Sequence, residues 1–150
     1  MMNYIIYTDG ACHVLTNKQG GYFFVLIDLD KQKYREYSNI DYNTTNNRME
    51  LKAVISALEH TEENSNIKIY TDSKYVSNPY NENWIIAWRK DKFNRLNSDL
   101  WKKLDNLVLK RNVKFIWIKG HNKDDLNERA NLLAVNASNK ELIDKDWTDL

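Results

Sequence analysis

Two apolar runs of the chain end on the same tripeptide, Tyr-Thr-Asp, and this repeat restricts the fold more than any other feature of the sequence. The runs span residues 4–9 and 67–72, lack proline and are rich in β-branched and aromatic side chains, which is typical of buried strands. A helical pattern separates them, so a right-handed crossover sets the strands parallel. Asp9 and Asp72 then lie at the carboxyl ends of parallel strands, where open α/β sheets bind ligands. Gly10, directly after Asp9, predicts a tight turn.

The two strand-end aspartates need compensation if they lie close together. At ~4 Å and an effective dielectric constant near 20, two carboxylates repel each other by about 4 kcal/mol. A divalent cation is the obvious group to offset this repulsion. The alternative is that Asp9 and Asp72 only cap turns at the ends of their strands. The repeat by itself leaves both interpretations open.

The bulk composition limits the class of protein. A chain of 150 residues is the size of one domain, and its net charge of +1 excludes a polybasic nucleic-acid arm, so any nucleic-acid affinity must come from a local patch. A single cysteine excludes an internal disulfide and fits a reducing compartment. The sequence shows neither an apolar run long enough to span a membrane nor the pattern of a signal peptide, so we expect a cytoplasmic protein.

The remaining pattern predicts one α/β domain over residues 1–150, in which about residues 139–150 form a polar tail. Two strands that follow the first form an antiparallel meander with it, and the third strand lies at the sheet edge. The later strands pair in parallel, which gives a five-stranded mixed sheet flanked by helices. The other expected strands are residues 21–29, 34–40 and 112–119, and the expected helices are about residues 47–60, 74–77, 82–90, 98–111 and 126–137.

Glu50 is an unusual residue for its predicted position. It lies in the first turn of a helix and shares a face with Val54 and Ala57, on the side that packs on the core. A carboxylate there needs a partner, because buried charges are rarely left unpaired. One alternative is a capping box with Asn47, three residues earlier. The other is that Glu50 joins the strand-end aspartates.

Four motifs follow one another in order along nearly the whole chain. They are Thr-Asp-Gly-Ala-Cys at residues 8–12, Thr-Asn-Asn-Arg-Met-Glu-Leu at 45–51, Tyr-Thr-Asp-Ser-Lys-Tyr-Val at 70–76, and Lys-Gly-His at 119–121 with Asn-Glu-Arg at 127–129. Each motif alone is weak, but the four in register resemble type 1 ribonuclease H specifically. The resemblance implies a ribonuclease H-like fold and cleavage of the RNA strand of an RNA–DNA hybrid, which leaves 3′-hydroxyl and 5′-phosphate ends.

The resemblance also implies a metal-dependent mechanism. Asp9, Glu50 and Asp72 are expected to bind two Mg²⁺ ions, or Mn²⁺ as a substitute, with Asp9 as the bridging ligand, because these ions prefer hard oxygen ligands. Two ions about 3.5–4 Å apart activate the attacking water and stabilise the leaving oxygen. His121, in a loop after a glycine, is expected to move protons or to assist product release.

One position departs from the family pattern. The family carries a fourth carboxylate two residues after Asn-Glu-Arg, and this chain has Asn131 there. An amide oxygen can bind a metal but brings no charge, so we expect weaker binding of the second ion and an attenuated enzyme. Asn131 is either a difference that the natural enzyme tolerates or an engineered change that allows binding without cleavage.

The resemblance extends to contacts with an RNA–DNA hybrid, which a monomeric protein is expected to bind. Thr45 and Asn47 resemble a phosphate pocket for the DNA strand. Asn46, Cys12 and the Gly10 backbone resemble groups that line the minor groove, where 2′-hydroxyls are displayed. For Trp84 and Trp88, the alternative to a nucleic-acid contact is that the two rings pack as a pair. The expected contacts in the third motif and in a shortened aromatic and basic handle are Lys74, Trp84, Trp88, Arg89, Lys90 and Phe93.

Three other functions stay open at this point. Asn131 suggests a module that binds the hybrid without cutting it. A nuclease or transposase of similar fold that acts on DNA is disfavoured by the motif at residues 45–51 and by the small size of the chain. A thiol enzyme based on Cys12 is disfavoured because the sequence shows no electropositive setting for this thiol.

Overall fold

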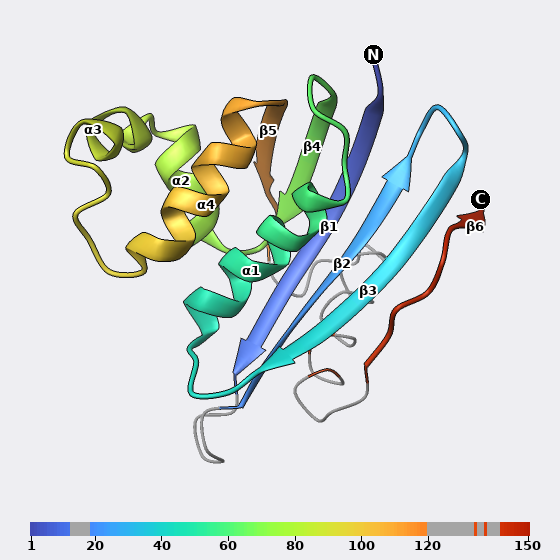
Figure 1. Cartoon of the computed structure of the whole chain (residues 1–150), viewed down its shortest axis with the longest axis horizontal. Helices are drawn as coiled ribbons and strands as arrows, with labels where there is room; N and C mark the ends of the chain where they lie inside the picture. Colours follow the sequence, from blue (N-terminus) through green and yellow to red (C-terminus); the bar gives the residue numbers. More distant parts are fainter. Residues whose placement is uncertain (13–18, 120–133, 135–136, 138–141) are drawn as a thin grey trace.

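The structure of the chain is a computed structural model that describes residues 1–12, 19–119, 134, 137 and 142–150. Its described part is built on one mixed sheet with the strand order β5-β4-β1-β2-β3-β6 (Figure 1). The strands are β1 (Asn3–Cys12), β2 (Gly20–Asp28), β3 (Lys33–Asp41), β4 (Asn66–Thr71), β5 (Asn112–Trp117) and β6 (Thr148–Asp149). The helices are α1 (Asn46–Glu59), α2 (Lys74–Asn81), α3 (Trp84–Lys90) and α4 (Ser98–Leu109). None of these helices is long and apolar enough to cross a membrane.

The strand directions confirm the predicted topology. β1 and β3 both pair antiparallel with β2, which gives the meander. β4 pairs in parallel with β1 on one side and with β5 on the other. The mixed sheet flanked by helices is therefore the α/β arrangement that the sequence predicts.

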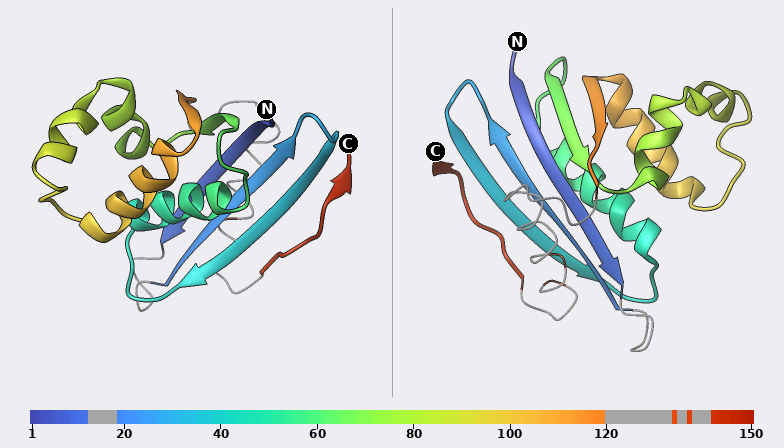
Figure 2. Two further views of the ribbon diagram at one scale, coloured as in Figure 1. Left: turned by 45° about the horizontal axis from the view of Figure 1, so that its top comes forward. Right: turned by 180° about the vertical axis from the view of Figure 1, so that it is seen from behind.

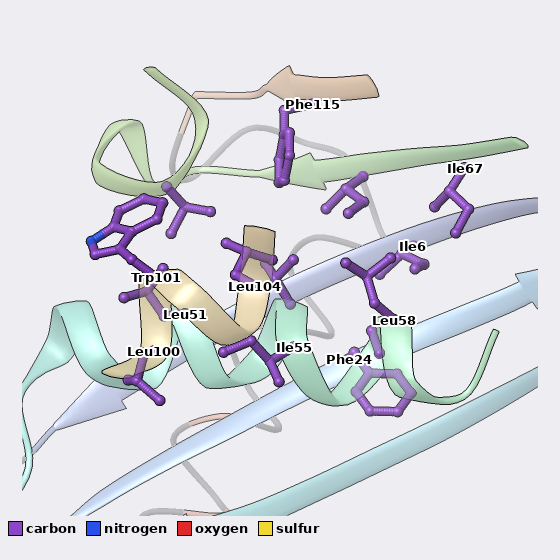
Figure 3. Packing of buried hydrophobic residues seen from close by; sticks show 14 of the residues in the cluster. Ile6, Phe24, Leu51, Ile55, Leu58, Ile67, Leu100, Trp101, Leu104 and Phe115 are labelled. Carbon is purple, nitrogen blue, oxygen red and sulfur yellow. The ribbon is translucent and has the colours of Figure 1, made fainter. Parts of the chain in front are cut away.

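One face of the sheet buries the larger apolar core. α1 packs on β1 and β2, and α4 packs on α1, so both helices lie on the same side of the sheet (Figure 2). Ile6 and Phe24 of the sheet belong to one buried cluster with Leu58 of α1 and Trp101 of α4 (Figure 3). This packing fixes α1 against β1, and it therefore fixes the first turn of α1 relative to the carboxyl end of β1.

A short sixth strand lies within the predicted polar tail and pairs with β3, so the prediction that β3 is the edge strand of the sheet is wrong. β6 pairs antiparallel with the start of β3, and the Ser38 N–H donates to the Ile143 carbonyl at 2.7 Å. Arg35 and Asp144 add an ion pair at 2.9 Å. The tail covers backbone groups that an edge strand leaves unpaired. Its mostly polar residues carry no strand pattern, because the pairing depends on β3 and not on local propensity.

α2 is longer than the sequence predicts. Asn78 and Pro79 are expected to end the helix, yet it continues to Asn81 with Pro79 inside it. Pro79 has no backbone N–H, so the helix lacks one hydrogen bond there. The start of the helix is stabilised separately, because the Ser73 hydroxyl accepts from the Val76 N–H at 3.3 Å. α3 begins at Trp84 rather than at residue 82, because the residue before it has a left-handed backbone with φ of 61°.

Candidate active site

β1 continues beyond Asp9, through the position where the sequence predicts a turn. The strand continues through Gly10 to Cys12 and stays paired with β2, so the predicted turn is absent. Gly10 serves close packing instead: a β-carbon there would lie 2.4 Å from the backbone carbon of Met49 and 2.5 Å from the nitrogen of Glu50. Only hydrogen fits, and α1 therefore begins directly against the end of β1. The Gly10 N–H also donates to Asp9 Oδ1 at 2.9 Å.

Glu50 does not form the capping box that the sequence offers as an alternative. The N-cap of α1 is Thr45 rather than Asn47, and its hydroxyl accepts from the Arg48 N–H at 3.2 Å. Glu50 is buried, and its Oε2 has no hydrogen-bond partner among the residues that the structure describes. A buried carboxylate oxygen without a donor is unfavourable, so a ligand is the expected partner.

Asp9, Glu50 and Asp72 converge although they come from three different parts of the chain. Their carboxylates each offer an oxygen, and these oxygens all lie within 4.8 Å of one another. Asp72 follows β4 directly, and the parallel pairing of β4 with β1 brings it to the same end of the sheet as Asp9. Burial, with repulsion from Asp72, raises the pKa of Asp9 to about 7. Burial and repulsion from Asp9 raise the pKa of Glu50 well above its ordinary value.

This carboxylate cluster fits a divalent cation. Its donors are carboxylate oxygens, which Mg²⁺ and Mn²⁺ prefer, and Glu50 Oε2 is an oxygen that no described residue uses. Burial and mutual repulsion raise the pKa of Asp9 and of Glu50, so the ionised form of the cluster is unfavourable without a compensating cation. A bound cation stabilises the ionised carboxylates, so metal binding and proton release are coupled.

Trp117 supports the cluster from β5, and the sequence gives little signal for it. Its indole N–H donates to the backbone carbonyl of Asp72 at 3.0 Å. The ammonium of Lys74 lies 4.6 Å from the centre of a Trp117 ring, which is a cation–π distance. A tryptophan at the end of an apolar run is expected in the core, but Trp117 is 40% exposed. Its hydrogen bond holds the backbone of Asp72 from the neighbouring strand.

The residues predicted to line the hybrid's grooves lie around the start of α1. Thr45, Asn46 and Asn47 are exposed, although the Thr45 hydroxyl also caps the helix. Cys12 is half-buried, and its thiol donates to the Thr44 carbonyl at 3.5 Å. Their position near the carboxylates suits contact with a substrate, and their roles as nucleic-acid contacts stay predictions.

The aromatic part of the predicted handle is only partly at the surface. Trp84 is exposed, whereas Trp88 packs edge-on against Trp101 with the ring centres 5.0 Å apart. Phe93 is buried. Trp88 and Phe93 therefore hold α3 on the core, and Trp84 is the handle aromatic that presents its ring to solvent.

The two basic residues of α3 differ in their availability. The Arg89 guanidinium donates two hydrogen bonds of 2.9 Å to Asp105, which is buried and also accepts from the Tyr80 hydroxyl at 3.1 Å. Lys90 is exposed and forms no ion pair with the described part of the chain. Arg89 therefore stabilises the fold, and Lys90 is the less restrained cation.

Two predicted site residues, His121 and Asn131, lie outside the described residues, and their roles stay predictions from the sequence. Most of the predicted helix over residues 126–137 lies outside them too. Ala134 and Ala137 are described, and both are helical and buried.

The matches to known proteins cover nearly the whole chain. The family model for RNase H matches residues 1–139. The chain belongs to the ribonuclease H family. Among its relatives, the Ribonuclease H of Trichodesmium erythraeum is 43% identical over 141 residues, which are 90% of this chain and 88% of that protein. The Ribonuclease H of Pseudoalteromonas atlantica is 46% identical over 146 residues, which are 92% of each.

Solved structures agree with this family assignment. A crystal structure of a type 1 RNase H with the type 2 active-site motif has a TM-score of 0.83 at 25% identity, and the match covers 97% of this chain and 78% of that one. The foamy viral protease-reverse transcriptase in complex with dsDNA has a TM-score of 0.74 at 25% identity. Ribonucleases H cleave the RNA strand of RNA–DNA hybrids, so the chain is a metal-dependent endoribonuclease.

Proposed function

We propose that this ribonuclease H hydrolyses the RNA strand of a hybrid endonucleolytically by a two-metal-ion mechanism and leaves 3′-hydroxyl and 5′-phosphate ends. The observation that carries the proposal is the carboxylate cluster, in which oxygens of Asp9, Glu50 and Asp72 lie within 4.8 Å of one another. Mg²⁺ is the proposed cofactor, with Mn²⁺ as a substitute. His121 and Asn131 complete the proposed site, and a monomer binds the hybrid.

The protein's part in this mechanism is to hold charge in fixed positions. Asp9 would help to hold both ions, and the Gly10 N–H orients one of its oxygens. Glu50 is held by the close packing of α1 on Gly10, and Asp72 by the hydrogen bond from Trp117 to its carbonyl. When bound, the ions supply a water of lowered pKa and stabilise charge on the leaving oxygen. Because the carboxylates are already in place, little rearrangement accompanies the reaction.

The experiment that tests this function is incubation of an end-labelled RNA–DNA hybrid with the protein in Mg²⁺, in Mn²⁺ and in EDTA. We expect internal cleavage of the RNA strand in either metal, no cleavage in EDTA, and no cleavage of duplex DNA of the same sequence. Binding of the hybrid without cleavage in both metals identifies the non-cutting module instead. Cleavage of the duplex DNA identifies a DNA nuclease of similar fold.

Asn131→Asp is expected to lower the Mg²⁺ concentration for half-maximal cleavage. At ~4 Å and an effective dielectric constant near 20, an added carboxylate attracts a divalent ion by about 8 kcal/mol. Desolvation and repulsion from the other acids offset most of this, which leaves about 1–3 kcal/mol, or about a tenfold to hundredfold gain in ion affinity or rate. The measurement is initial rate against Mg²⁺ for both proteins. Coinciding curves mean that position 131 does not serve the metals.

Trp117→Phe is expected to slow cleavage about fivefold without unfolding the protein. The change keeps an aromatic ring beside Lys74 but deletes the hydrogen bond to the Asp72 carbonyl. A neutral hydrogen bond contributes about 1 kcal/mol, which corresponds to about fivefold in rate. Single-turnover kinetics measure the effect, and Trp147→Phe, which changes an indole of the C-terminal segment before β6, is the matched control. An unchanged rate in Trp117→Phe shows that Asp72 does not depend on this support.

Arg89→Ala and Lys90→Ala are expected to act on different properties. Arg89→Ala leaves the Asp105 carboxylate buried without its cation, which destabilises the fold. The expected cost is about 2–3 kcal/mol, a reduced value because the Arg89 side chain is 36% exposed and solvent screens the pair. Lys90→Ala is expected to raise KM for the hybrid and leave kcat unchanged, because a remote phosphate contact binds ground and transition states alike. Urea unfolding and steady-state kinetics separate the two. An unchanged KM in Lys90→Ala removes α3 from the proposed interface.

A further inference from the structure

A hollow lies at the opposite end of the sheet from the carboxylate cluster. Its volume is about 560 Å³, and it is lined by the first residues of β1, β4 and β5 and by Leu29. These strands are parallel, so their amino ends meet at one edge of the sheet. At about 3.3 Å per residue, Asn3 lies about 20 Å along β1 from Asp9. A ligand in this amino-end hollow is therefore separate from the metal site.

Two lysines stand side by side on the amino-end hollow. Lys68 of β4 and Lys114 of β5 are partners in the parallel ladder, and both are exposed. Neither forms an ion pair with a residue that the structure describes. Like charges directly opposite each other on adjacent strands are destabilising. An anion between the two ammonium groups offsets this repulsion, as a cation does for the carboxylates at the other end of the sheet.

A row of three asparagines borders the lysines one pleat away. Asn112 donates from Nδ2 to Asn66 Oδ1 at 2.9 Å, and Asn66 donates from Nδ2 to Asn3 Oδ1 at 3.2 Å. Asn3 in turn donates from its backbone N–H to the carboxylate of Asp30 at 2.6 Å. These bonds orient the amides. An amide nitrogen has two donors, so Asn66 and Asn112 each keep one N–H that no described residue uses.

We propose that the amino-end hollow binds a nucleoside phosphate. The phosphate oxygens accept from Lys68 and Lys114, and the base lies against the apolar side chains of Ile5 and Leu29. The free N–H groups of the asparagine row face the polar edge of the base or the sugar. The volume is within the range of about 300–1,000 Å³ that is typical of small-molecule sites. A site for phosphate alone needs neither the apolar wall nor the oriented amides.

Isothermal titration calorimetry of the full chain in EDTA tests the proposal with ADP, inorganic phosphate and adenosine. We expect ADP to bind with a Kd of about 1 mM or lower, and phosphate and adenosine each at least about tenfold more weakly. The double variant Lys68→Gln/Lys114→Gln is expected to raise the Kd for ADP at least about tenfold and to leave hybrid cleavage unchanged. Lys102→Gln/Lys103→Gln removes the same charge from α4 and is expected to change neither.

Asn112→Ala separates recognition of the nucleoside from recognition of the phosphate. This exposed residue is expected to contribute to binding of ADP and not to binding of inorganic phosphate. ADP that fails to bind, or that binds both double variants equally, overturns the proposal. Equal affinities for ADP and phosphate overturn the nucleoside assignment. Loss of hybrid affinity in the Lys68→Gln/Lys114→Gln variant without any ADP binding in the parent also overturns it, because the lysines then belong to the nucleic-acid interface.

Discussion

Asp9→Asn is expected to lower hybrid cleavage in Mg²⁺ by at least about a thousandfold, which corresponds to ~4 kcal/mol of transition-state stabilisation. Asparagine keeps the size of the side chain and an oxygen for the Gly10 N–H, but it removes one charge from the carboxylate cluster. Glu50→Gln and Asp72→Asn are expected to act similarly, because each residue supplies one of the clustered carboxylates. The measurement is the single-turnover rate of hybrid cleavage at saturating Mg²⁺.

The control for these variants is Glu82→Gln, which removes an exposed carboxylate at the C-cap of α2. We expect it to cleave the hybrid at the parental rate. Circular dichroism of every variant separates loss of activity from loss of fold. A parental rate for Asp9→Asn in Mg²⁺ would falsify the assignment of the cluster as the metal site.

The main topology is predictable from the sequence because it depends on local patterns. The Tyr-Thr-Asp repeat with a helix between its copies leads to the parallel pair β1 and β4, and the apolar runs after Gly20 lead to the meander. Features that depend on a distant partner are not predictable in this way. β6 exists because β3 offers unpaired backbone groups, and α2 continues past Pro79 within a packed structure that outweighs its missing donor.

In the candidate site, too, residues with local sequence signals are predictable and contacts between distant residues are not. Asp9, Glu50 and Asp72 carry motif and strand-end signals, and the structure brings these three together. The glycine at position 10 is also visible in the sequence, but a glycine after a strand suggests a turn. The structure shows that glycine is needed there because α1 approaches the strand closely. The support from Trp117 joins residues of different strands, so no spacing along the chain reveals it.

Folding without metal is expected to depend on pH through the same cluster. Burial raises the pKa of Asp9 from its ordinary value of 3.8 to about 7, and it raises the pKa of Glu50 as well. The folded state therefore holds protons that the unfolded state releases, so stability falls as the pH rises from the unfolded pKa through the folded one. One pKa unit corresponds to about 1.4 kcal/mol, so we expect the titration of Asp9 alone to cost the metal-free parent about 3 kcal/mol between about pH 5 and about pH 7.5.

Urea unfolding of the parent and of Asp9→Asn in EDTA isolates the contribution of Asp9. The variant lacks the titrating carboxyl, so we expect its stability advantage over the parent to grow by about 2–3 kcal/mol between about pH 5 and about pH 7.5. The histidines are the same in both proteins, so their contribution cancels in the difference between the two unfolding free energies. Asp99 does not titrate in this range, because its hydrogen bonds and ion pair with Arg48 lower its pKa to about 2. Mg²⁺ is expected to narrow the gap, because it binds the ionised cluster of the folded parent. A gap that does not change with pH means that Asp9 is already ionised in the folded protein near pH 5, and that burial does not control its charge.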